Sequence, residues 1–241
     1  MTKLSVVLGT YNQKECLEKS LLAYNDQTID GSQFEVIVVD SSSTDGTDQL
    51  LETLKNTVKF NLRYFIQENT GKVGARNRGV NEAQSELIMI TDGDMIPDPN
   101  LIQTHIQAHK DTKEDATFEG RTFNMRTLEW PTKPENLYPL VPDRYKNMKK
   151  LGFYYFLTGN ISFKKSLFDA NSGFDMDFQG YGWEDLEMGY RLFSKNIPHY
   201  YLKDAINYHY HIVEGFQGVD REYHKGVSAA IFLKKHPELK W

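Results

Sequence analysis

Residues 34–47 read FEVIVVDSSSTDGT, and this stretch decides the fold class. Its first six residues are mostly apolar and β-branched, which is typical of a strand buried on both faces of a sheet. Asp40 ends the run, and polar, turn-forming residues follow. A helix is expected next, because Thr47 or Asp48 can cap one that extends to about Asn56. The stretch therefore predicts a strand, a turn and a helix, with a carboxylate where the strand ends.

The same succession of strand, turn and helix recurs before and after this stretch. We expect further buried strands at 4–8, 62–66 and 87–91, and helices over about 14–25 and, after a loop at 71–74, over 76–83. This alternation predicts an α/β fold with a mostly parallel, Rossmann-like central sheet and flanking helices. Ligands of such sheets bind beyond the carboxyl ends of the strands. The segments expected at that edge are 9–12, 40–43, 67–69 and 92–94.

The second half of the chain is less regular, and 241 residues suit one large domain. No internal repeat, low-complexity tract or clear linker divides it. The expected elements are a helix at 100–110, strands within 113–127, a long loop at 129–150, a strand at 156–163, a short helix at 164–169, a helix at 184–195, a strand at 205–210 and a helix at about 223–235.

Composition excludes several classes of protein. Cys16 is the single cysteine, so the chain can form neither an intramolecular disulfide nor a cysteine-based zinc cluster. The net charge of -5, with lysine and arginine spread along the chain, argues against nucleic acid as a partner. Apolar stretches fall far short of the ~20 residues that span a bilayer. We expect a cytoplasmic protein without a transmembrane anchor, and contact with a membrane surface stays open.

Asp92-Gly93-Asp94 is the first motif that carries chemistry. Mg²⁺ and Mn²⁺ prefer oxygen ligands and are commonly held by one or two carboxylates together with phosphates. Two carboxylates separated by one residue at a strand end can divide this work, one facing the ribose or a metal-bound water and the other binding the metal. The alternative is a solvated turn, since Asp-Gly-Asp is also good turn chemistry. The buried strand expected before the motif favours the metal.

Residues 180–185, Gly-Tyr-Gly-Trp-Glu-Asp, open a helix whose expected buried face is Leu186, Gly189, Tyr190 and Phe193. Glu184 and Asp185 fall in its first turn, where the helix dipole favours an ionised carboxylate. A carboxylate there can act as general base towards an acceptor hydroxyl. The alternative is that both acids only cap the helix. The glycines and Trp183 favour a site, because such a segment can bend around a sugar and present an aromatic face to it.

Two further groups of residues are candidates. His209 and His211 point to the same face of the expected strand, so one of them could be a third metal ligand, although a polar edge strand has the same pattern. Residues 71–79 place Lys72 and Arg76 at a helix start, where they could approach a nucleotide or a phosphate. They match neither the P-loop nor the dinucleotide fingerprint, and a solvated helix with structural glycines explains them equally well.

These motifs, in this order, resemble those of the family 2 glycosyltransferases, and the resemblance covers about residues 3–211. Any one motif is weak, but the ordered set is specific. The segments that carry it are 5–12, 36–47, 74–79, 92–94, 158–164, 173–175 and 182–185, the last three as in the galactosyl- and N-acetylgalactosaminyltransferase-like branch. The resemblance implies a GT-A nucleotide-diphospho-sugar transferase fold in one domain. Residues 1–98 would form its nucleotide-binding half and 99–241 its acceptor-binding half.

The resemblance also implies roles for single residues. Thr10 and Asp40 would contact the uridine, with Tyr11 and Gly93 beside the nucleotide-sugar and Arg76 near the base or the diphosphate. The remaining roles implied are Asp92 at the ribose and metal site, Asp94 as ligand of Mn²⁺ or Mg²⁺, His209 as late metal ligand with His211 in reserve, Asp185 as catalytic base, Glu184 holding sugar hydroxyls and Trp183 stacking on sugar.

The expected activity is inverting transfer of a sugar from a UDP-sugar, such as UDP-galactose, UDP-N-acetylgalactosamine or UDP-glucose, to a glycan or glycoconjugate acceptor. The Gln-x-x-Arg-Trp motif of processive synthases does not occur. Segment 212–220 could close over the donor. A sugar nucleotidyltransferase is a weaker alternative, because residues 9–12 lack its glycine-rich signature, and a non-catalytic binding module would not need the acidic residues. Acceptor, linkage and oligomeric state stay open.

Overall fold

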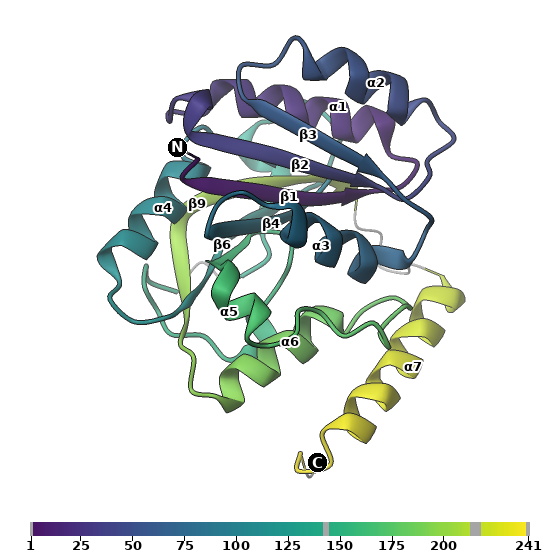
Figure 1. Cartoon of the computed structure of the whole chain (residues 1–241), viewed down its shortest axis with the longest axis vertical. Helices are drawn as coiled ribbons and strands as arrows, with labels where there is room; N and C mark the ends of the chain where they lie inside the picture. The colour runs from purple at the N-terminus through teal and green to yellow at the C-terminus, as the bar shows by residue number, and fades with distance from the viewer. Residues whose placement is uncertain (1, 142–144, 213–217, 240–241) are drawn as a thin grey trace.

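One mixed sheet organises the protein (Figure 1). The computed structural model describes residues 2–141, 145–212 and 218–239. Within them the strand order is β3-β2-β1-β4-β8-β6-β9-β5, and β7 pairs with β6. In the first half the elements are β1 (Leu4–Thr10), α1 (Lys14–Ala23), β2 (Phe34–Asp40), α2 (Thr47–Lys55), β3 (Asn61–Ile66), α3 (Gly71–Glu82) and β4 (Leu87–Asp92).

The second half adds β5 (Met95–Pro97), α4 (Leu101–Asp111), β6 (Thr117–Met125), β7 (Leu137–Pro139), β8 (Ile161–Lys164), α5 (Lys165–Asp169), α6 (Glu184–Ser194), β9 (His199–Ile212) and α7 (Val219–Lys235). Short 3₁₀ helices lie at Tyr24–Asp26, Gly31–Gln33, Pro134–Asn136 and Phe153–Tyr155. No helix of the described residues combines the length and apolarity that crossing a bilayer requires.

The sheet is parallel where the chain alternates strand and helix. β3, β2, β1 and β4 are all parallel neighbours, as predicted. Their register sets Thr10 opposite Asp40 and Gly9 opposite Asp92, so the polar segments after three strands lie side by side. β8 joins antiparallel to β4 and β6, whereas β9 runs parallel to β6 and antiparallel to β5. The pairing with β5 carries the histidine segment of β9 to the residues that follow β4.

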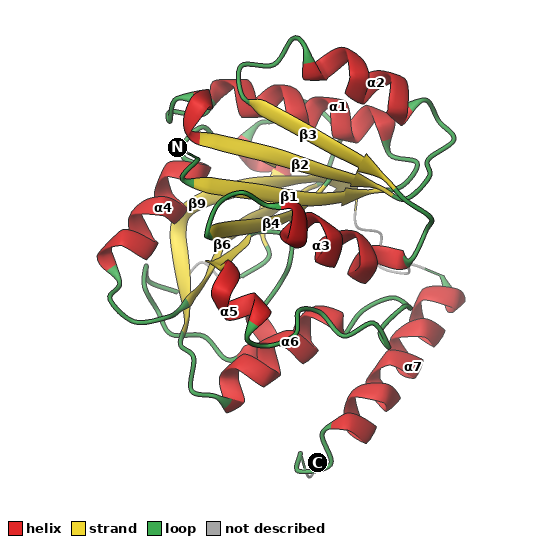
Figure 2. Cartoon of the chain, in the orientation of Figure 1, coloured by secondary structure: helices red, strands yellow, loops and turns green. Residues whose placement is uncertain are grey.

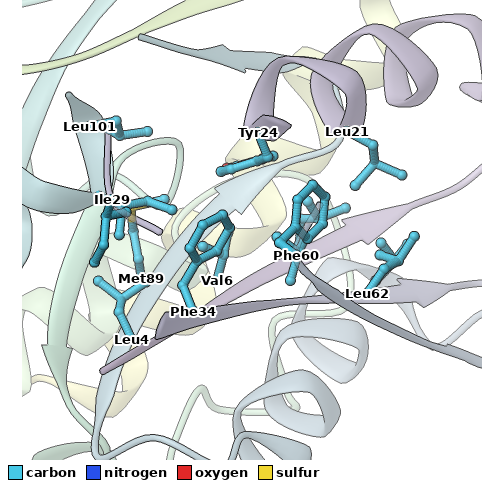
Figure 3. Close-up of a cluster of buried hydrophobic side chains, with 14 of the residues drawn as sticks. Leu4, Val6, Leu21, Tyr24, Ile29, Phe34, Phe60, Leu62, Met89 and Leu101 are labelled. Atoms are coloured by element: carbon cyan, nitrogen blue, oxygen red, sulfur yellow. The ribbon is translucent and has the colours of Figure 1, made fainter. Parts of the chain in front are cut away.

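Helices cover both faces of the sheet (Figure 2), with α1 and α2 on one side and α3 on the other. Successive side chains of a strand point to opposite faces. Val36 and Val38 accordingly join the cluster under α1 and α2, whereas Ile37 and Val39 join the cluster under α3. The first cluster includes Tyr24, Phe34 and Phe60 (Figure 3), and the Phe34 and Phe60 rings stack with centroids 5.4 Å apart.

Helix α3 lies close against β1, because a Cβ added at Gly79 would come within 2.3 Å of Val7 Cγ1. This approach needs glycine, since a larger side chain would push the helix off the sheet. The predicted loop at 71–74 is wrong: the helix begins at Gly71 and includes Lys72 in its first turn. Gly71 itself adopts a φ of +73°, which glycine tolerates.

Other boundaries differ in the second half. The strand expected at 156–163 is reduced to β8, because the chain turns at residues 158–160 just before it. β9 begins at His199, well before the expected 205, and α7 begins at Val219. Phe193, expected in the buried face of α6, is 50% exposed. Glu187 lies on the buried side instead, because it forms an ion pair with Arg191 (2.8 Å) and a hydrogen bond with His236 (3.2 Å).

Candidate active site

A cavity of about 640 Å³ opens beyond the carboxyl ends of β1 and β4. The ends of these strands, the start of α3, the end of β9 and the start of α7 all contribute to its wall. Its lining includes Gly9, Thr10, Tyr11, Ser41, Lys72, Arg76, Asp92, Asp94, Tyr181, His209, His211, Arg221, Glu222 and Lys225. Seven of the twelve residues that were given individual roles from the sequence are in that wall, which lies at the predicted edge of the sheet.

Arg76 joins two of the predicted acidic motifs. Its side chain rises from α3 and is almost fully buried. Nη1 lies 2.9 Å from Glu184 Oε1 and Nη2 lies 3.1 Å from Asp92 Oδ1. A buried guanidinium needs such partners, because desolvation of an unpaired charge is costly. Arg76 therefore holds the end of β4 and the start of α6 together.

Asp92 stays ionised in this setting. Its second oxygen, Oδ2, lies 3.4 Å from Lys72 Nζ. Burial opposes the charge of the Asp92 carboxylate, but the positive charges of Lys72 and Arg76 outweigh it and lower the pKa of Asp92 to about 2. Asp92 thus enters the cavity as a carboxylate with two cations beside it.

The start of α6 places Glu184 and Asp185 through an unusual backbone. Gly182 and Trp183 both have positive φ angles, 84° and 73°, so the chain turns sharply just before the helix. Glu184 Oε2 is buried without a hydrogen-bond partner among the described residues. Burial and the adjacent charge of Glu184 raise the pKa of Asp185 to about 7, against the opposing effect of Arg76. Asp185 can therefore exchange a proton near neutral pH.

Asp94 and His209 face each other across the cavity wall. Asp94 Oδ2 lies 3.4 Å from His209 Nε2, and the buried Asp94 Oδ1 has no hydrogen-bond partner among the described residues. On its other side the His209 ring is oriented by Asn124, since Nδ1 lies 3.0 Å from Asn124 Oδ1. The ring of His211 is next to that of His209, with centroids 5.5 Å apart.

Asp94 and His209 fit a divalent cation that takes its other coordinating atoms from a bound substrate and from water. In the described part of the chain, no group of three or more His, Cys, Asp and Glu side chains is arranged as a complete metal site. An orphaned buried carboxylate oxygen beside an imidazole with an oriented ring is nevertheless the kind of donor set that such a cation uses. Because Mg²⁺ and Mn²⁺ usually take their remaining ligands from phosphates and water, two protein donors suffice.

Five of the residues proposed from the sequence lie outside the cavity wall. Asp40 is buried and accepts a hydrogen bond from the Ser43 backbone N–H, next to the lining residue Ser41. Gly93 is in contact with Thr10, because a Cβ there would lie 3.5 Å from Thr10 Oγ1. Glu184 is joined to the lining residue Arg76 by a 2.9 Å ion pair, and Asp185 follows Glu184 in the chain. Trp183, the fifth, packs against α7.

Tyr181, two residues before Trp183, is in the cavity wall. The Trp183 ring contacts Phe232 of α7 instead, with centroids 5.0 Å apart. Sequence reasoning also missed Arg221 and Lys225, because α7 has no motif and only the tertiary fold brings its first turns to the cavity. The segment 212–220, predicted to close over the donor, includes 213–217, which lie outside the described residues.

Comparison with known proteins identifies the chain. Residues 5–171, more than half of its length, match the family described as "Glycosyl transferase family 2". The chain belongs to glycosyl transferase family 2. Residues 143–215 also match the family described as "N-terminal domain of galactosyltransferase".

Two curated relatives illustrate that this chain spans only part of the length of the proteins it matches. The chain is 27% identical over 268 residues to the validoxylamine A glucosyltransferase of Streptomyces hygroscopicus subsp. limoneus, covering 98% of this chain and 57% of that protein. It is 25% identical over 270 residues to the chondroitin synthase of Pasteurella multocida, covering 97% of this chain and 27% of that protein. This chain thus corresponds to only part of these relatives.

Solved structures confirm the GT-A fold. S. aureus TarS residues 1–349 in complex with UDP superimposes with a TM-score of 0.68 at 19% identity, covering 99% of this chain and 73% of that one. A mannosyltransferase from Pyrobaculum calidifontis, in complex with GDP-Man and Mn²⁺, gives a TM-score of 0.70 at 18% identity, covering 99% and 65%.

Proposed function

We propose that this glycosyltransferase moves a sugar from a UDP-sugar to an acceptor hydroxyl of a glycan or glycoconjugate, with inversion at the anomeric carbon and with Mn²⁺ or Mg²⁺. One observation carries the proposal: Arg76 joins Asp92 to Glu184 beside the cavity into which Asp94 and His209 project. Four segments far apart in the chain contribute these residues, which would provide a cation site, a neutralised carboxylate and a proton acceptor.

Asp94 and His209 would hold the metal ion, with His211 as the reserve ligand. When bound, such an ion neutralises negative charge on the departing diphosphate. Asn124 keeps the His209 ring turned so that Nε2 faces Asp94. Asp92, already paired with Lys72 and Arg76, would face the ribose and complete the acidic rim of the site.

Asp185 would be the general base. The acceptor oxygen attacks the anomeric carbon from the face opposite the diphosphate, the carbon–oxygen bond to UDP breaks, and the hydroxyl proton passes to Asp185. A base with a pKa of about 7 is matched to this task at neutral pH. Glu184 contributes by keeping that pKa raised, and its unpartnered oxygen can accept a hydrogen bond from a sugar hydroxyl.

The uridine would bind at the ends of β1 and β2. Thr10, whose hydroxyl is buried without a partner among the described residues, and Asp40 lie opposite each other there, with Tyr11 and Gly93 adjacent. Residues 1–98 would form this nucleotide half and 99–241 the acceptor half. The UDP and UDP-GlcNAc complexes of TarS support a uridine donor, whereas the Pyrobaculum enzyme is complexed with GDP-Man.

Release of UDP from a panel of UDP-sugars with Mn²⁺ tests the proposal, with GDP-mannose as the comparison donor. We expect slow UDP release onto water from the preferred donor and faster release with the correct acceptor. Asp185→Asn should bind the same donor without transferring its sugar. A protein that binds UDP-sugars but never releases UDP would be a binding module, and one that forms a UDP-sugar from UTP and a sugar phosphate would be a nucleotidyltransferase.

A further inference from the structure

The first turns of α7 form a wall of the cavity, which no sequence motif predicted. Arg221 and Lys225, one helical turn apart, line it together with Tyr181. In Figure 1 the start of α7 approaches the start of α3, the helix that carries Lys72 and Arg76. Two pairs of cationic side chains, from α3 and from α7, therefore belong to the same cavity.

The two pairs differ in how far their charges are already balanced. Lys72 and Arg76 are matched by the carboxylates of Asp92 and Glu184. Lys225 pairs with Glu222 at 2.7 Å, but both side chains are largely solvent-exposed, so this pair contributes little and separates easily. No carboxylate of the described residues lies within ion-pair distance of Arg221. Among the residues that the structure describes, Arg221 is therefore a cation of the cavity wall with no carboxylate partner, and Lys225 is one whose partner is exposed.

Tyr181 positions these cations. The guanidinium carbon of Arg221 lies 4.2 Å from the centre of the Tyr181 ring, and Lys225 Nζ lies 5.8 Å from it. The segment before α6 is itself packed on α7, since a Cβ added at Gly180 would meet Ser228 Oγ at 3.4 Å. The contact of Trp183 with Phe232 anchors the same segment. The cations are thus attached to a packed helix.

We propose that Arg221 and Lys225 form an anion-binding subsite that takes the diphosphate of the nucleoside diphosphate donor. This inference rests on the function proposed above. A guanidinium can bind two phosphate oxygens at once, and a lysine adds a point charge beside it. The diphosphate needs such donors because the acidic side chains of the cavity already balance Lys72 and Arg76. The subsite holds the donor and later the UDP product by their phosphates, whatever the transferred sugar is.

Calorimetric titration of the full chain with UDP and with uridine, both with Mn²⁺, tests the subsite. Arg221→Gln should weaken UDP binding by about tenfold or more, the loss expected when a charge-assisted hydrogen bond is removed. Lys225→Gln should weaken it by less. Uridine, which has no phosphate, should bind both variants as it binds the wild type. Lys234→Gln, an exposed lysine of the same helix outside the cavity, is the matched control and should change neither affinity.

Thermal melts confirm that each variant is folded, and Arg221→Lys should restore part of the UDP affinity because it keeps the charge. Equal UDP affinity for wild type and Arg221→Gln would overturn the subsite while leaving the proposed transfer intact. An equal loss for UDP and uridine would also overturn it, because the arginine would then shape the cavity without binding phosphate. A wild type that binds no UDP or GDP with Mn²⁺ would overturn both proposals.

Discussion

Removing the Arg76 guanidinium is the sharpest test of how this site is held together. Arg76→Met keeps most of the side-chain volume and leaves Glu184 and Asp92 without the partner that lies 2.9 and 3.1 Å away. Breaking one side of a buried ion pair costs about 3–5 kcal/mol, because the remaining charge is desolvated and unpaired. For a chain of this size that loss corresponds to a fall in Tm of roughly 6–20 °C.

The assay is chemical and thermal unfolding of Arg76→Met beside Lys164→Met. Lys164 forms a 2.6 Å ion pair with Asp115 on the surface, where both side chains are more than a third exposed. Removing it should cost at most about 1 kcal/mol. The double variant Arg76→Met/Glu184→Gln should recover part of the lost stability, because it removes one of the stranded charges.

The pH dependence of the same variant follows from Asp92. Its pKa falls from 3.8 to about 2 in the folded protein, so its ionisation stabilises the fold above pH 4, and this stabilisation is lost as the pH falls towards 2. The difference between wild type and Arg76→Met should therefore shrink over that range. An Arg76→Met protein within about 1 kcal/mol of wild type at pH 7 would refute the role of Arg76 as internal counter-ion.

Three predictions concern the reaction. kcat/KM should rise with pH with a midpoint near 7, because the base Asp185 must be ionised. Glu184→Gln should move this rise to lower pH, because it removes a charge that raises the pKa of Asp185. A rise at the ordinary pKa of a carboxylate would remove Asp185 from this role. Asp94→Asn should abolish the Mn²⁺ dependence of UDP binding measured by calorimetry, and unchanged dependence would contradict the assignment. His209→Ala should weaken Mn²⁺ binding more than His211→Ala does, and the reverse order would exchange their roles.

The first half of the fold was predictable because its signals are local. Buried strands such as 34–39 are short apolar runs, and each ends in polar turn residues. The carboxyl ends of parallel neighbours must share an edge, so the convergence of Thr10, Asp40 and Asp92 followed from the strand order alone. The helix boundary at Gly71 was missed because glycine at a helix start has the same local signature as a loop.

The second half of the fold depends on tertiary contacts that cannot be predicted from single residues. Glu187 was not expected in the buried face of α6, because its partner His236 is 49 residues away in the sequence. Trp183 was expected to stack on the sugar, but its backbone is left-handed and its ring packs on α7. Arg221 and Lys225 could not be chosen, since tertiary contacts such as the packing of Phe232 against Trp183 bring α7 to the cavity.

The position of β9 has a consequence for the order of folding. Met95 pairs with His209, so the wall that carries Asp94 is completed by residues more than a hundred positions later. Contacts between residues so far apart in the sequence form late, because closing a long loop loses conformational entropy before the contact contributes any stability. During synthesis the parallel strands emerge first, and a ribosome must extend the chain through β9 before this wall can exist. A nascent chain can therefore collapse around its first strands well before Asp94 and His209 can face each other.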